Sequence, residues 1–169
     1  MRKNAMVILA IVSSVIIMVG VVIGVLTLDS VDDGNRTEIN FTEETLEGKV
    51  EFREMMLHPG ETAEYTVHLT NEIEGACRLG INFDEYKPNL LANELKEYVY
   101  VTVTLGDKTV CKDVLLKDLF STELPVMDCV LDAKEPVELA ISFHMPVETG
   151  NEAEFTEAFF DVVLNISNE

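Results

Sequence analysis

Tryptophan is absent from this 169-residue chain, and so are the common signatures of catalysis. There is no G-x-S-x-G nucleophile elbow, no phosphate-binding loop and no dinucleotide-binding fingerprint. The only histidines, His58, His68 and His144, form no H-E-x-x-H pair and are not spaced like zinc ligands. The sequence therefore indicates a protein that is not an enzyme and carries no cofactor, and it makes an exported hydrolase the least favoured class of function.

Charge and proline are both lacking from residues 5–28, which follow the cations Arg2 and Lys3. A helix of that length extends about 36 Å, enough to cross a hydrocarbon core of about 30 Å. The positive-inside rule keeps the N-terminus in the cytoplasm and places the rest of the chain outside. We therefore expect a single-pass cell-membrane protein with an extracellular domain, or a secreted protein if the segment is cleaved as a signal.

Gly20 and Gly24 form a G-x-x-x-G pair within the predicted membrane helix. Such a pair lets two membrane helices approach closely. Glycine is also generally common in membrane helices, so the pair is a candidate helix–helix contact with a simple alternative explanation.

Basic residues are scarce after the apolar segment. Residues 29–169 hold ten lysines and arginines against 31 acids, a net charge of −21. This charge argues against nucleic acid and against an anionic membrane surface as partners. Residues 29–40 are polar and acidic and are predicted to form a stalk. Asp29, Asp32 and Asp33 in the stalk are weak candidates for binding calcium, because their spacing differs from that of an EF-hand.

The cysteines number three, so at most one internal disulfide can form. Cys111 and Cys129 flank a compact insert and are the predicted pair. Cys77 belongs to an alternating stretch and is expected to be a small core residue.

Most of the remaining chain alternates apolar and polar residues with a period of two, which is typical of strands with one buried face. Turn signals separate these runs at His58–Glu61 and at residues 106–108. Short helices are expected after Asn89 and from Asp113. Residues 41–169 are therefore predicted to form an all-β domain: an antiparallel two-sheet β-sandwich, immunoglobulin-like or jelly-roll-like, with one or two short helices. The predicted core residues are Val101, Val103, Leu139, Ile141, Phe143, Val162 and Leu164.

Two segments resemble the TasA–camelysin family of exported prokaryotic surface and biofilm-matrix proteins. In the first, the turn Pro59-Gly60-Glu61 leads into a strand that ends at Asn71. In the second, residues 146–152 precede a last strand at residues 159–166. The resemblance implies a β-sandwich, and several members of that family assemble into fibres by donating an N-terminal strand to a neighbour. The longer N-terminal segment of this chain departs from that pattern.

Together these observations predict a non-enzymatic cell-surface or extracellular-matrix structural protein. It would be tethered through residues 5–28 and would associate with itself or with other surface or matrix proteins. The alternative from a different class is an exported module that binds carbohydrate or calcium, although the absence of tryptophan removes the commonest aromatic platform.

Overall fold

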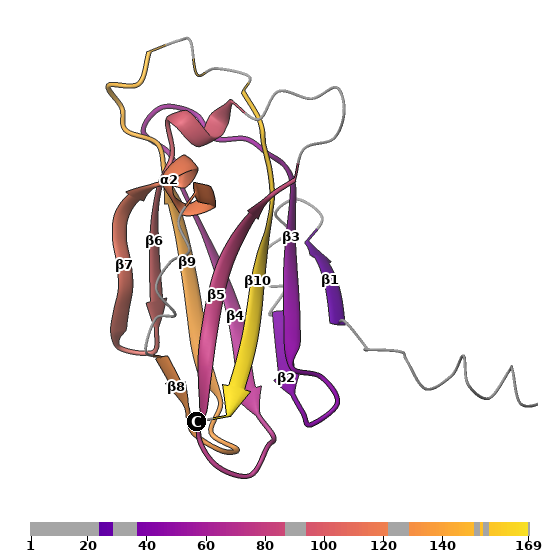
Figure 1. Ribbon diagram of the computed structural model, residues 1–169. Coiled ribbons are helices and arrows are strands. Elements are labelled where there is room, and N and C mark those ends of the chain that lie inside the picture. The colour runs from indigo at the N-terminus through magenta and orange to yellow at the C-terminus, as the bar shows by residue number, and fades with distance from the viewer. Residues whose placement is uncertain are drawn as a thin grey trace, which may run out of the picture.

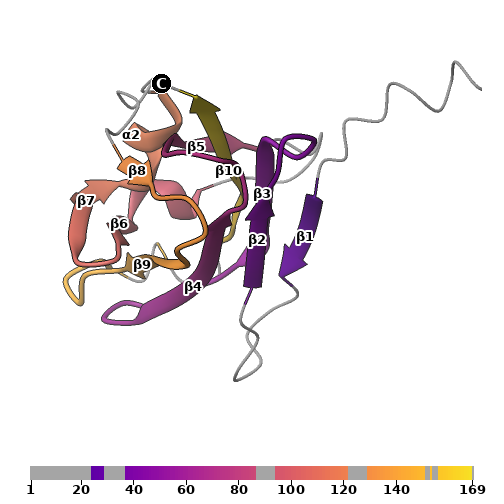
Figure 2. The same cartoon turned by 90° about the horizontal axis from the view of Figure 1, so that it is seen from below.

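The computed structural model describes residues 24–28, 37–86, 94–121, 129–150, 153 and 156–168, which form two five-stranded sheets packed face to face (Figures 1 and 2). The first sheet contains, in spatial order, β1 (Gly24–Leu28), β3 (Glu47–Met55), β10 (Ala158–Asn168), β5 (Cys77–Glu85) and β8 (Cys129–Leu131). The second contains β2 (Thr37–Phe41), β4 (Thr62–Asn71), β9 (Val137–His144), β6 (Tyr100–Leu105) and β7 (Lys108–Leu115). Pairing is antiparallel except for β1 with β3 and β2 with β4. The predicted all-β sandwich is therefore confirmed.

The predicted alternation of buried and exposed residues is also confirmed. In β6 and β9 every buried position is apolar, and the buried positions alternate with more exposed ones. All seven predicted core residues are buried, each with an exposed fraction of 0%. A shift of register by one residue would turn these side chains toward water, so burial of one face fixes the pairing.

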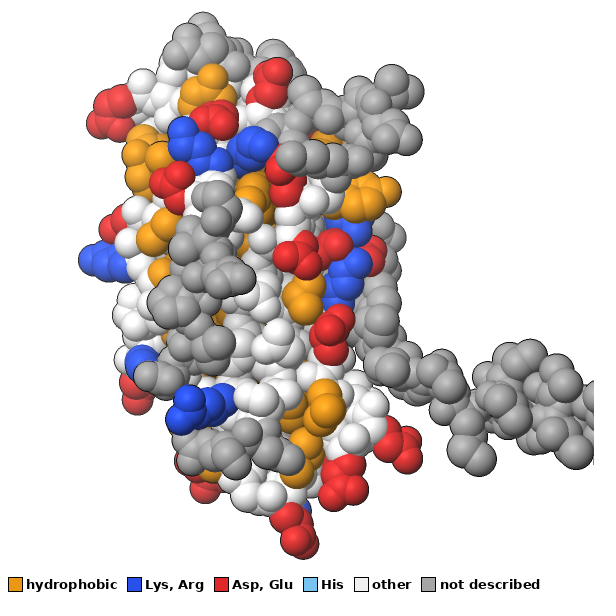
Figure 3. All heavy atoms as spheres, in the orientation of Figure 1, with side chains coloured by type: hydrophobic (Ala, Val, Ile, Leu, Met, Phe, Trp, Pro, Cys, Tyr) orange, Lys and Arg blue, Asp and Glu red, His pale blue; other side chains and the backbone are white. Residues whose placement is uncertain are grey.

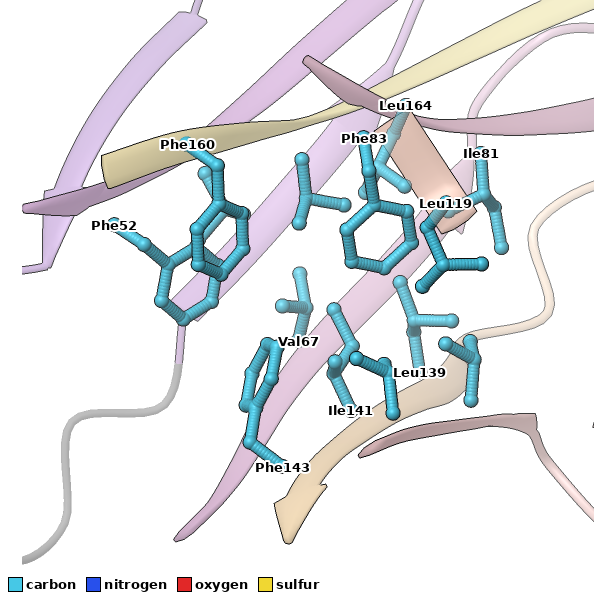
Figure 4. Packing of buried hydrophobic residues seen from close by; sticks show 14 of the residues in the cluster. Phe52, Val67, Ile81, Phe83, Leu119, Leu139, Ile141, Phe143, Phe160 and Leu164 are labelled. Atoms are coloured by element: carbon cyan, nitrogen blue, oxygen red, sulfur yellow. The ribbon is translucent and has the colours of Figure 1, made fainter. Parts of the chain in front are cut away.

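Aromatic rings fill one end of the core, between the two sheets (Figure 4). Phe160 of β10 stacks on Phe52 of β3, with ring centroids 4.6 Å apart. Phe143 of the opposite sheet lies 5.6 Å from Phe160 and 5.3 Å from Phe52. Because these rings come from both sheets, the cluster holds the sheets together as well as filling the interior.

Both predicted turns are present. The N–H of Glu61 donates to the carbonyl of His58 at 2.9 Å, and Gly60 has a φ of 87°. Gly106 begins the tight hairpin between β6 and β7 with a φ of 54°. Glycine suits both positions because it has no Cβ to clash at positive φ.

The predicted helices are shorter than expected. Helix α2 (Leu116–Ser121) begins after Asp113, which lies within β7 and adopts a φ of 51°. Val114 and Leu115 pair with β6, so strand pairing extends past the expected start of the helix. After Asn89, the 3₁₀ turn η1 (Leu95–Glu97) is present, while residues 87–93 lie outside the described residues.

The N-terminal boundaries also differ from the prediction. Residues Gly24–Leu28 form strand β1 rather than the end of a membrane helix, and the predicted stalk gives way to strand β2 at Thr37. Val25 and Thr27 are β-branched and favour a strand, and pairing with β3 satisfies backbone groups along one side of β1. Gly24 therefore begins a strand, whereas Gly20 and residues 1–23 lie outside the described residues. Among the residues that are described, no helix has the length and apolar character needed to cross a bilayer.

Candidate functional site at the sheet edges

Four strands form the edges of the two described sheets: β1 and β8 in one, β2 and β7 in the other. The two N-terminal strands, β1 and β2, lie on the same side of the sandwich, and β7 lies on the opposite side (Figure 2). An edge strand presents unpaired N–H and C=O groups that can pair with another chain. These edges are therefore the natural places to look for an interaction site.

The β7 edge carries features that discourage pairing. Lys108 and Lys112 are exposed, and its register with β6 shifts around Val103. Asp113 adopts positive φ, and its N–H donates to Oγ1 of Thr102 at 3.2 Å. Lysines and irregular register are common means of protecting a sheet edge from other chains.

The β1 edge lacks such protection. Its sequence, GVLTL, contains neither charge nor proline. The strand runs parallel to β3 in unbroken register from Gly24 opposite Gly48 to Leu28 opposite Phe52. Its other side has no partner strand among the described residues. A regular, uncharged edge of this kind is suited to pairing with another strand.

Strand β2 contributes side chains to the core. Thr37, Ile39 and Phe41 are buried, whereas Glu38 and Asn40 face outward. Ile39 packs closely on Gly48 of β3. A Cβ added to Gly48 would lie only 2.7 Å from Cγ2 of Ile39. β2 therefore belongs to the core although it lies at the edge of its sheet.

An ion network covers β3 and β10 on the outer face beside β1. Asp161 accepts from Lys49 at 2.8 Å and from Arg53 at 2.7 Å, and both cations also contact Glu51. The Arg53 guanidinium lies 4.4 Å from the ring centre of Tyr86. The hydrogen bond to Asp161 raises the pKa of Lys49 above its ordinary value. Figure 3 shows acidic and basic side chains side by side over these strands, which locally neutralises an otherwise acidic surface.

A shallow hollow of about 190 Å³ lies on the outer face of the second sheet. Its lining residues are Glu38, Asn40, His68, Thr70 and Pro136. His68 stands opposite Glu38 on β2 and, on its other side, opposite Glu138 on β9. The hollow is below the roughly 300–1,000 Å³ typical of ligand pockets.

The other two histidines lie on the surface outside this hollow. His144 is exposed on β9, and its Nδ1 lies 3.0 Å from Oγ1 of Thr62. His58 is exposed before the turn. In the described parts of the chain, no group of three His, Cys, Asp or Glu side chains could hold a metal ion. The calcium candidates Asp29, Asp32 and Asp33 lie outside those parts.

Asn71, the strand-ending asparagine of the family resemblance, is completely buried. Its Nδ2 donates to the carbonyls of Gly75 at 2.9 Å and Leu131 at 3.1 Å. Its Oδ1 accepts from the N–H of Ile73 at 3.0 Å. The side chain therefore shapes the loop after β4 and ties it to β8 in the other sheet, a structural role that the sequence pattern alone did not reveal.

The structure does not bring the predicted Cys111–Cys129 pair together in one sheet. Cys111 lies on β7 in one sheet and Cys129 on β8 in the other, so their disulfide stays a prediction. Burial raises the pKa of the Cys111 thiol, so this residue is a poor nucleophile. Cys77 is buried in the core, as predicted.

Comparison with known proteins gives no independent guide to this arrangement. No protein-family model matches the chain, and no curated protein matches it either.

Proposed function

We propose that this protein is a non-enzymatic structural component of the cell surface or extracellular matrix, anchored in the membrane by its N-terminal segment and able to associate with itself. The observation that carries the proposal is the uncharged β1 edge, placed opposite a protected β7 edge. An unprotected β1 edge on one side of the sandwich and a protected β7 edge on the other favour strand pairing through β1.

The anchor remains compatible with strand β1. If the strand begins at Gly24, residues 5–23 are still uncharged and apolar. A helix over those residues would extend about 28 Å, close to the thickness of the hydrocarbon core. The sandwich would then follow the membrane helix almost directly, and neighbouring copies would be concentrated in the plane of the membrane.

The strand order supports a jelly-roll-like rather than an immunoglobulin-like description. Strands β3 to β10 are arranged as β3-β10-β5-β8 in one sheet and β4-β9-β6-β7 in the other. Eight strands in two sheets of this kind characterise a jelly roll. The buried role of Asn71 and the turn at Gly60 give physical reasons for motifs that resemble the TasA–camelysin family.

The net negative charge of the domain means that two copies can associate only when cations reduce their repulsion. A net charge of −21 over residues 29–169 opposes close approach of two copies. At about 0.15 M salt the Debye length is about 8 Å, so monovalent ions relieve the long-range repulsion. Calcium binds carboxylate oxygens directly and should act at a lower concentration.

This account predicts cation-dependent self-association without hydrolytic activity. A chain beginning at Gly24 keeps all ten described strands, and its mass can be followed by light scattering during titration with sodium chloride and then calcium chloride. We expect larger particles in both titrations, with calcium effective at the lower concentration. A particle that remains monomeric throughout both titrations would contradict the assembly proposal.

A matched pair of variants locates the contact. Leu26→Lys introduces a charge into the uncharged β1 edge and should reduce association. Thr109→Lys introduces the same charge at an exposed position on β7 and should leave association nearly unchanged. Equal effects of the two substitutions would show that general charge, rather than the β1 edge, controls assembly.

A further inference from the structure

Two of the cysteines lie on neighbouring strands. Cys77 is opposite Leu131 and Cys129 is opposite Leu79 in the antiparallel pairing of β5 with β8. The two cysteines are thus diagonal neighbours, offset by two residues in the register. Residues two apart along a strand point to the same face of the sheet, so both cysteines share a face. Both side chains point into the core, with exposed fractions of 1%.

Their geometry is close to that of a disulfide. Diagonal neighbours across antiparallel strands are about 7–8 Å apart, whereas the Cα atoms of a disulfide are usually about 4.4–6.8 Å apart. Forming the bond therefore requires the backbone of β8 to shift relative to β5. β8 has three residues and, within the described part of the chain, pairs only with β5, so such a movement leaves the central strands in place.

We propose that Cys77 and Cys129 are an oxidisable pair that forms an intramolecular disulfide between β5 and β8. The two thiols would exchange with a small disulfide such as oxidised glutathione. One new S–S bond forms, the bond of the small disulfide breaks, and the two thiol protons and two electrons leave with two molecules of reduced thiol. Burial of both sulfurs in the folded chain means that exchange occurs during folding or when β8 opens.

The third cysteine cannot replace either member of this pair. Cys111 lies on β7 and pairs with Val103 of β6. These strands belong to the sheet that does not contain β5 and β8, and this position separates Cys111 from both members of the pair. Cys111→Ser is therefore the control that removes a thiol without touching the proposed bond.

The disulfide would link the short edge strand β8 covalently to β5. It closes a loop of about 50 residues that contains β6, β7 and α2, and a crosslink of that length restricts the unfolded chain strongly. For a domain of this size we expect the oxidised protein to melt about 10 °C above the reduced protein. Asn71 also contacts β8, through its hydrogen bond to the Leu131 carbonyl.

The test uses the full chain in detergent, unfolded in denaturant and refolded with mixed oxidised and reduced glutathione, followed by proteolysis and mass spectrometry without reductant. The expected result is a linked peptide pair containing Cys77 and Cys129, lost on reduction and retained in Cys111→Ser. The higher melting temperature should disappear with dithiothreitol.

Other outcomes overturn the proposal. A bond that includes Cys111, a disulfide between two chains, or three thiols that stay reduced after refolding with oxidant would each do so. Mapping the linkage in the unmutated chain and in Cys111→Ser avoids dependence on variants of buried cysteines, which can fail to fold.

Discussion

Replacing Phe160 with alanine is expected to lower the free energy of unfolding by about 3–5 kcal/mol, a large share of the roughly 5–15 kcal/mol typical of a domain. Phe160 is completely buried and contacts four other rings. Its partners come from both sheets and from α2, so truncation would leave a cavity where these elements meet. Denaturant unfolding, followed by circular dichroism, measures the change.

Val147→Ala is the control for this substitution. Val147 is apolar but 70% exposed, and its truncation should change the free energy of unfolding by less than about 0.5 kcal/mol. If the two variants unfold at similar denaturant concentrations, the aromatic cluster does not hold the sheets together as described.

Asn71→Ala is expected to destabilise the domain by about 2–4 kcal/mol, although it removes few atoms. The substitution deletes three hydrogen bonds and leaves the Ile73 N–H and the Leu131 carbonyl without their partner inside the protein. Buried backbone groups that lose a partner cost more than the net value of the bond itself. Thermal unfolding of the variant should show a correspondingly lower melting temperature.

The matched control is Asn40→Ala, which removes the same side chain from an exposed position on β2. Its effect should be within about 0.5 kcal/mol. A small effect at both positions would indicate that the Asn71 contacts do not tie the β4–β5 loop to β8.

Much of the sandwich could be predicted from local sequence because burial of one face imposes a period of two. Val101 and Ile141 fall on the inward faces of β6 and β9 for that reason. The turns at Gly60 and Gly106 were visible because glycine tolerates positive φ. These features depend on residues close together in the chain.

The N-terminal strands could not be predicted in the same way. Residues 24–28 are as apolar as the segment before them, and composition alone does not distinguish the end of a helix from an edge strand. Thr37–Phe41 alternates, but it follows an acidic stretch, and its parallel partner β4 is distant in sequence. Both segments form strands because they pair with strands that lie further along the chain.

The contacts at the candidate site also could not be predicted from the sequence, because they join segments that are distant along the chain. The proximity of Cys77 and Cys129 depends on β8 joining β5, and the contact of Asn71 with Leu131 spans 60 residues. The contrast between the β1 and β7 edges likewise depends on the order of strands in each sheet. Spacing along the chain contains little information about such contacts.

The proposal that the sandwich is displayed outside the cell is tested most directly by adding protease to intact cells that make the full chain. Arg2 and Lys3 before an uncharged segment predict that the domain lies outside. We expect the domain to be degraded in intact cells while a cytoplasmic marker protein survives. A domain fully protected in intact cells but digested after lysis would contradict the account.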